Sequence, residues 1–220
     1  MHVKAIEQMA LLWDQANVPG LKTVYDLVSQ NRSKGSPFAN HPYSKLPELC
    51  CRAAGGDPTL AEDVTAAWNS LYFSAYLLDG VADGDAPACE SGIRVTLAAA
   101  CISSASLLLM TGSQLDISTG VFQAIQRNFQ RPVLVACNGP VNDLTLSTPT
   151  IEQCWQVTRE KTGEFYALAC RSGARVATED QECILSFSDF GLHLGMLVQI
   201  GDDMNGLLDL LARTVPRRGL

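Results

Sequence analysis

The segment Tyr76-Leu-Leu-Asp79-Gly-Val-Ala-Asp83-Gly-Asp85 decides the fold, because it places carboxylates at the end of a long, helical and otherwise apolar stretch. Asp79 and Asp83 are four residues apart, so a helix projects both carboxylates from one face, about 6 Å apart. An ionised carboxylate among leucines is costly unless a cation compensates it. Mg²⁺ prefers oxygen ligands of this kind, together with phosphate oxygens and water. The spacing therefore predicts a cation site, with helix capping and surface charge as the alternative.

A second carboxylate cluster, Val198-Gln199-Ile-Gly-Asp202-Asp203, lies on another apolar helical segment. Two such clusters on facing helices would clamp a metal-bound diphosphate between them. Either cluster alone is equally compatible with surface carboxylates, so the prediction depends on the pair.

The helix that ends at the first cluster has an apolar, aromatic inner face. One stripe at helical spacing contains Trp68, Tyr72, Ala75, Tyr76, Asp79 and Asp83. This layout suits a ligand with a charged head group at the carboxylates and a hydrocarbon chain along the apolar face. Ser74 and Ala75 leave the upper part open, and Tyr72 and Trp68, about 10 and 16 Å from Asp79 along the helix, are expected to form the floor. An ordinary core stripe that ends at a solvated helix tip is the alternative.

Lys161-Thr162 lies in the middle of a later helical segment whose neighbouring positions are mostly apolar. A lysine beside a cavity can hold a phosphate as a point charge. A lysine that extends its ammonium to solvent is the alternative.

Helical periodicity extends over nearly the whole chain, which predicts one all-α domain over residues 1–220. No strand alternation, repeat or linker interrupts it, and Pro132 is expected to kink its helix. The expected helices are His2–Ala16, Leu21–Gln30, Leu46–Ala54, one from Asp57-Pro58 to about Ala86, Ser91–Met110, Ser118–Cys137, Thr150–Ala177 and Glu179–Leu211.

Composition excludes several classes of function. A net charge of -7 argues against nucleic-acid binding, which needs clustered Lys and Arg. The eight cysteines are scattered, without a C-x-x-C pair, so they predict core filling rather than zinc or disulfides. The apolar run Ala98–Met110 is too short to span a membrane, and the amino terminus lacks a signal-peptide layout. We therefore expect a soluble, cytoplasmic protein.

Together these segments resemble the trans-type isoprenyl diphosphate synthases, or polyprenyl synthetases, which have the class I isoprenoid synthase fold. The family's D-D-x-x-D motif corresponds to Asp79-Gly80-Val81-Ala82-Asp83 after two leucines. Its F-Q-I-x-D-D motif corresponds to Val198-Gln199-Ile200-Gly201-Asp202-Asp203, and its K-T/S-G motif to Lys161-Thr162-Gly163. The matching segments occur in the family's order over residues 45–210.

The resemblance implies a helical bundle around a central cavity, in which three Mg²⁺ ions bridge the two clusters to the diphosphate of an allylic substrate. It also implies a homodimer, or a heterodimer with a full-length prenyl synthase. Departure of the diphosphate would leave an allylic cation, shielded in the apolar tunnel. The implied metal ligands are Asp79, Asp83, Asp202 and Asp203. The implied substrate and catalytic residues are Lys161, Thr162, Gln199, Tyr72, Ala75, Tyr76, Lys45 and Arg94.

Several family positions are altered. Gly80 replaces the second aspartate of the first motif, and Gly206 replaces the last aspartate of the second. The basic segment that binds isopentenyl diphosphate is reduced to Lys45 within Asn40–Pro47, and the arginine pair after the first motif is reduced to Arg94. The chain also ends near Leu220, before the family's lysine-bearing lid.

Three functions agree with this pattern. The first is an enzyme that ionises an allylic prenyl diphosphate and uses an acceptor other than isopentenyl diphosphate, or cyclises the product as a terpene synthase does. The second is a chain-elongating synthase. The third is a non-catalytic subunit that regulates a full-length synthase. The retained aspartates and Lys161 favour an enzyme, whereas the reduced basic segment disfavours elongation.

Overall fold

The computed structural model describes residues 43–82, 84, 88–111, 118–130 and 150–214, and within them it contains helices and no strand. The all-α prediction is confirmed. Asp83, Pro132 and the two helices expected before residue 31 lie outside the described residues.

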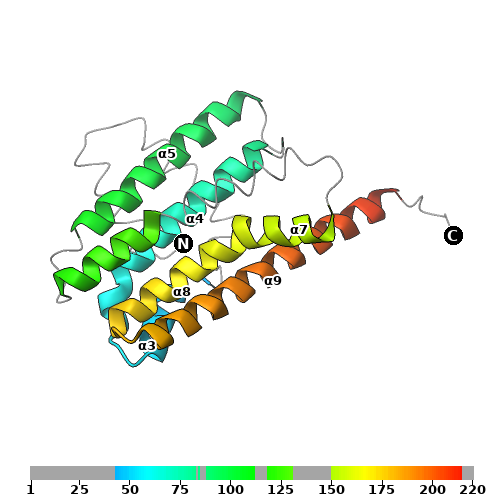
Figure 1. Ribbon diagram of the computed structural model, residues 1–220. Helices are drawn as coiled ribbons and strands as arrows, with labels where there is room; N and C mark the ends of the chain where they lie inside the picture. Colours follow the sequence, from blue (N-terminus) through cyan, green and yellow to red (C-terminus); the bar gives the residue numbers. More distant parts are fainter. Residues whose placement is uncertain (1–42, 83, 85–87, 112–117, 131–149, 215–220) are drawn as a thin grey trace.

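The helices run roughly alongside one another (Figure 1). In Figure 1, α8 lies along α9 on one side, and α4 packs against α5 on the other. A further helix covers residues 119–130. The labelled elements are α3 (Leu46–Ala53), a 3-10 turn (Pro58–Ala61), α4 (Glu62–Ala82), α5 (Ala88–Thr111), α7 (Ile151–Thr158), a π turn (Arg159–Gly163), α8 (Glu164–Ala177) and α9 (Gln181–Thr214).

Two of the expected helices differ from the structure. The helix predicted from Asp57-Pro58 begins with a 3-10 turn, whose cap is the Asp57 side chain accepting the Thr59 N–H at 2.9 Å, and it ends at Ala82. Gly84 follows with φ of 73°, a conformation that glycine adopts without steric cost. The helix predicted over Thr150–Ala177 is capped by the Thr150 side chain, begins at Ile151 and contains the π turn.

Trp68 joins α4 to α8 at the centre of the core. Its ring is fully buried, and its Nε1–H donates to the Phe165 carbonyl at 3.0 Å. The ring also packs against Tyr72 and Tyr166, with centroid distances of 5.3 and 5.9 Å. This aromatic cluster fixes the position of α4, which carries the first aspartate motif, relative to α8.

Glycines on α9 bring its backbone against the π turn and α8. A Cβ at Gly195 would lie 2.6 Å from the Thr162 carbonyl oxygen and 2.9 Å from the Cβ of Tyr166. A Cβ at Gly191 would lie 2.6 Å from the Tyr166 carbonyl oxygen. Neither position has room for a side chain, so these glycines set the spacing of the two helices.

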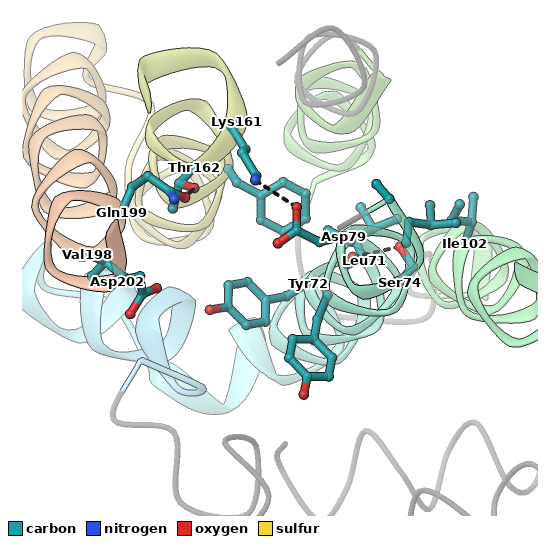
Figure 2. A pocket seen from close by; sticks show the side chains of 15 residues that line it. Leu71, Tyr72, Ser74, Asp79, Ile102, Lys161, Thr162, Val198, Gln199 and Asp202 are labelled. Carbon is teal, nitrogen blue, oxygen red and sulfur yellow. Dashed lines mark hydrogen bonds and ion pairs between the residues drawn. The ribbon is translucent and has the colours of Figure 1, made fainter. Parts of the chain in front are cut away.

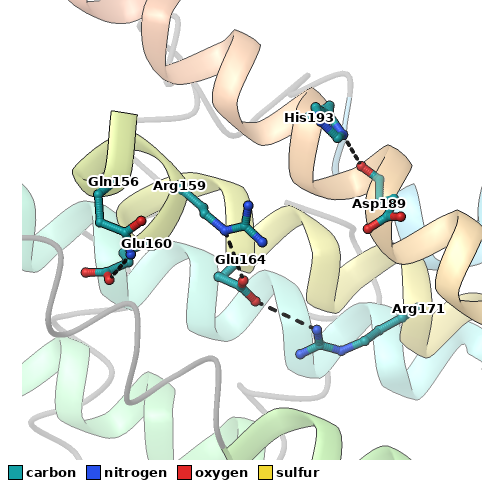
Figure 3. Close-up of polar contacts among 7 residues, drawn as sticks. All are labelled: Gln156, Arg159, Glu160, Glu164, Arg171, Asp189 and His193. Carbon is teal, nitrogen blue, oxygen red and sulfur yellow. Dashed lines mark hydrogen bonds and ion pairs between the residues drawn. The ribbon is translucent and has the colours of Figure 1, made fainter. Parts of the chain in front are cut away.

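Ion pairs on the outer side of α8 hold the π turn and the helix over residues 119–130 (Figure 3). Glu164 lies 4.0 Å from Arg159 and 3.9 Å from Arg171. Arg171 also donates to the Asn128 carbonyl at 3.2 Å. These contacts connect the π turn, α8 and the helix over residues 119–130.

Two helical segments have the length and apolar composition of a membrane span, in contrast to the expectation from the sequence. They are Glu90–Leu109 and Gln181–Leu208, with mean hydropathy of 1.7 and 1.4. Both pack within the bundle, the first against α4 and the second against α8. Core helices of bundle proteins share this composition, so it does not by itself assign either segment to a membrane.

Candidate active site

A cavity of about 360 Å³ opens between α4, the π turn, α8 and α9. Most of the residues singled out from the sequence contribute to its lining. They are Tyr72, Ser74, Ala75, Tyr76, Asp79, Lys161, Thr162, Gln199 and Asp202. The structure therefore brings parts of both aspartate motifs and the Lys-Thr pair to one space, from segments more than 100 residues apart at their extremes.

Lys161 reaches across the mouth of the cavity to the first aspartate motif. Its Nζ lies 2.7 Å from Asp79 Oδ1, and the two side chains are 16% and 39% exposed (Figure 2). Lys161 belongs to the π turn, which widens the helix by one residue per turn at this point. Short π segments of this kind are frequent at functional sites.

A chain of hydrogen bonds orders the α9 wall. The Thr162 hydroxyl donates to Gln199 Oε1, and Gln199 Nε2 donates to Asp203 Oδ1 at 2.9 Å. Gln199 lies one helical turn beyond Gly195. The close approach at Gly195 therefore places Gln199 within reach of Thr162.

Asp202 faces the cavity in an environment that disfavours its charge. Burial raises the pKa of Asp202, and the nearby negative charges of Asp203 and Asp79 raise it further. Asp79 and Asp202 stand on opposite helices and are close enough to affect one another electrostatically. The wall of the cavity thus has more negative charge than Lys161 compensates, which favours a bound cation.

The donors fit a cation that brings ligands of its own. Within the described residues, no three Asp, Glu, His or Cys side chains are grouped closely enough to hold a metal ion by themselves. Oxygens from a bound anion would have to complete the coordination of a divalent cation between Asp79 and Asp202. The arrangement therefore suits a metal–phosphate complex better than a bare ion.

Much of the cavity lining is apolar and aromatic. Tyr72 and Phe165 line the cavity, with ring centroids 6.0 Å apart, and Leu71 and Ile102 add aliphatic surface. Burial raises the pKa of the Tyr72 hydroxyl, with smaller contributions from the charges of Asp202 and Asp79. Trp68 does not contribute to the lining but lies directly beneath Tyr72. That Tyr72 and Trp68 form the floor stays a prediction, because Tyr72 contributes to the lining and Trp68 packs against it from outside the lining.

Besides Trp68, three described residues singled out from the sequence do not contribute to the lining. Lys45 is exposed at the start of α3, and Asp83 lies outside the described residues. Asp203 is exposed beside the cavity, where Gln199 contacts it. Arg94, on α5, pairs with Glu90 at 3.8 Å. Its Nη1 lies 2.7 Å from the position that a Cβ on Gly80 would occupy.

Sequence reasoning missed the π turn and the contributions of Leu78, Phe165 and Ile102 to the cavity. No local signal distinguishes a π turn from an α-helix in this segment. Phe165 has such a signal, because it follows Lys161 by four residues and so shares its face of the helix. Ile102 comes from α5 and depends on how that helix packs.

Comparison with known proteins supports the same fold. A geranylgeranyl diphosphate synthase from Mycobacterium tuberculosis is 30% identical over 167 residues, or 70% of this chain and 47% of the relative. The chain thus spans about half the length of that curated relative. A Caulobacter crescentus polyprenyl synthase, solved with calcium and isoprenyl diphosphate, superposes with a TM-score of 0.67 at 20% identity, covering 97% of this chain and 76% of that one. The geranyl diphosphate synthase small subunit of Antirrhinum majus gives a TM-score of 0.67 at 18% identity, covering 99% and 83%.

The family assignment comes from the sequence match over most of the helical bundle. Residues 90–213, more than half of the chain, match the polyprenyl synthetase family. The matched range includes the Lys161-Thr162-Gly163 turn and the second aspartate motif, and the first motif precedes it. The protein is therefore a member of the polyprenyl synthetase family.

Proposed function

We propose that the protein is a Mg²⁺-dependent enzyme that ionises an allylic prenyl diphosphate. The observation that supports this most strongly is the arrangement of Asp79, Asp202 and Lys161 around one cavity with an apolar interior. Opposed carboxylates and a lysine match the charge of a metal-bound diphosphate. The apolar interior matches a hydrocarbon chain attached to it.

Each side chain has a proposed task. Asp79 and Asp202 would bind Mg²⁺ from the two sides of the cavity. Asp203 and Asp83 would be further metal ligands in the second and the first motif. Lys161 holds a diphosphate oxygen as a point charge. Bound Mg²⁺ would neutralise negative charge on the departing diphosphate. Tyr72, Ala75, Tyr76 and Phe165 enclose the prenyl chain and exclude water from the allylic cation, while Thr162 and Gln199 place polar oxygens nearby.

The acceptor is proposed to be something other than isopentenyl diphosphate. A second diphosphate needs a second set of cations. The two candidates, Lys45 and Arg94, lie outside the cavity lining, where Lys161 is the cation among the described residues. Either another nucleophile or an internal double bond of the same substrate would then capture the cation.

Incubation of the protein with Mg²⁺ and allylic diphosphates of increasing chain length tests this proposal. We expect release of inorganic diphosphate, and we expect added isopentenyl diphosphate to change the rate less than about 3-fold, because Lys45 alone replaces a pocket of several cations. Strong stimulation with a longer product would instead support chain elongation, the activity that the Mycobacterium tuberculosis relative's name gives.

The third candidate is a non-catalytic subunit. A small subunit of a geranyl diphosphate synthase is among the proteins of similar structure, and Gly80 replaces a motif aspartate. Absence of turnover with every allylic substrate, together with association with a full-length synthase in size-exclusion chromatography, would favour this function.

For the enzyme, we propose a cytoplasmic homodimer, and size-exclusion chromatography with light scattering would test the dimer.

Tyr72→Ala should shift the preferred substrate toward longer prenyl chains. Tyr72 is a large side chain in the cavity lining, so its removal extends the space available to the chain. We divide kcat/KM for a chain one isoprene unit longer by kcat/KM for the preferred chain, and we expect this ratio to rise at least about 10-fold. Even a single methylene group in an apolar pocket is worth that much, and an isoprene unit has five carbons.

The matched control is Phe190→Ala, which removes an aromatic side chain that is 56% exposed on α9. This control should leave the length profile unchanged. Circular dichroism should establish that both variants are folded. An unchanged profile in folded Tyr72→Ala would place the floor of the cavity elsewhere.

A further inference from the structure

The ion pair between Lys161 and Asp79 uses an oxygen that the proposed metal needs. Lys161 Nζ lies 2.7 Å from Asp79 Oδ1, within hydrogen-bond distance, and the two groups come from opposite walls of the cavity. Among the described residues that line the cavity, Lys161 is the cation. The first aspartate motif is therefore compensated by an ammonium group of the protein itself.

We infer that Lys161 acts as a placeholder cation, so that metal and diphosphate bind as one unit and metal alone binds weakly. The inference rests on the proposed function, because it assigns Asp79 to the metal and Lys161 to the diphosphate. The inference adds how bound diphosphate changes the affinity for the metal, which the proposed function does not specify.

The geometry makes the ammonium group and a metal ion compete. A divalent cation on Asp79 would lie about 2.1 Å from its carboxylate oxygen. With Lys161 on the same carboxylate, the two positive charges would be within roughly 5 Å of one another and would repel. The side chain of Lys161 is largely withdrawn from water, so solvent screens this repulsion less than it would at the surface.

A diphosphate removes the conflict. Its oxygens offer Lys161 a partner of higher negative charge than a single carboxylate, so the ammonium can leave Asp79 without losing its ion pair. The vacated Asp79 oxygen and the diphosphate oxygens then become available to the metal together. Each ligand thus creates part of the binding site of the other, which is positive coupling by definition.

Among the described residues, α9 contributes no lysine or arginine to the cavity lining as a placeholder beside Asp202. Gln199 Nε2 occupies one oxygen of Asp203, but an amide carries no charge and does not compensate the carboxylates. The block to metal binding is therefore on the Asp79 side.

Binding of Mn²⁺, as a probe for Mg²⁺, is the measurement that tests the inference. Electron paramagnetic resonance or calorimetry would give the Mn²⁺ affinity with and without inorganic diphosphate. The proteins compared are the wild type, the neutral variant Lys161→Met, the charge-retaining variant Lys161→Arg, and the control Arg127→Met. Arg127 is exposed on the helix over residues 119–130 and does not line the cavity.

In the wild type and in Arg127→Met, we expect diphosphate to tighten Mn²⁺ binding at least about 10-fold, within the usual range of coupling between sites. In Lys161→Met, Mn²⁺ alone should bind about 5-fold or more tightly than in the wild type, and the effect of diphosphate should be smaller. Lys161→Arg should behave as the wild type does. If Lys161→Met does not fold, Lys161→Gln provides the same neutral replacement with a polar end.

The outcomes separate the inference from the proposed function. Equal or weaker binding of Mn²⁺ alone to the folded neutral variant, with diphosphate-dependent binding intact in the wild type, overturns the placeholder and leaves the proposed function standing. Absence of Mn²⁺ binding to the wild type even with diphosphate overturns both.

Discussion

Asp202→Asn should reduce Mg²⁺-dependent release of diphosphate from an allylic substrate at least about 100-fold. The substitution keeps the size of the side chain but removes the charge that holds a cation against the leaving group, and groups that stabilise developing charge contribute effects of this size. Asp79→Asn should have a similar effect, because Asp79 occupies the opposite side of the same cavity. A continuous assay for inorganic diphosphate measures both.

Loss of activity in Asp202→Asn should occur without loss of stability. Burial and the neighbouring carboxylates raise the pKa of Asp202, so its ionised form opposes folding near neutral pH, and its removal does not destabilise the protein. The control is Asp189→Asn on the same helix, whose side chain lies outside the cavity lining. A fully active Asp202→Asn would show that the second motif does not hold the catalytic metal.

Gly195→Ala should lower the free energy of unfolding by about 3 kcal/mol. The new methyl group would lie 2.6 Å from the Thr162 carbonyl oxygen and 2.9 Å from the Gly163 Cα. These are backbone atoms, so α9 has to move away from the π turn as a unit. The movement also separates Gln199 from Thr162, and a displacement near 1 Å should lower activity roughly 10- to 100-fold.

Urea unfolding of Gly195→Ala and Gly206→Ala would test this. Gly206 also lies within α9, but nothing lies within 4 Å of the position of its added Cβ. Alanine there should stabilise the helix by about 0.5–1 kcal/mol. Equal unfolding midpoints for the two variants would mean that the helices are not in close contact at Gly195.

The sequence predicts the helices well because their signals are local. The cap at Asp57, the capping box at Thr150 and the apolar periodicity of α9 each depend on residues within a few positions of one another. The exact end of α4 and the π turn depend on packing, and both were missed. Spacing along one helix likewise places Tyr72, Ala75, Tyr76 and Asp79 on a common face, which the cavity lining reproduces.

Contacts between helices could not be predicted in the same way. The pairing of Lys161 with Asp79 joins segments 82 residues apart in the sequence (161 − 79). Nothing in either segment specifies the rotation of one helix relative to the other. The position of Arg94 illustrates this dependence, because its guanidinium lies against Gly80 rather than in the cavity lining.

The contact between Arg94 and Gly80 makes the two positions epistatic. An aspartate introduced at position 80 would place its Cβ where Arg94 Nη1 now lies, so the arginine would shift and pair with the new carboxylate. That carboxylate would then be neutralised by the arginine and would not be available to a metal. Restoring a metal-binding aspartate at position 80 therefore requires that Arg94 be replaced as well, and that it be replaced first.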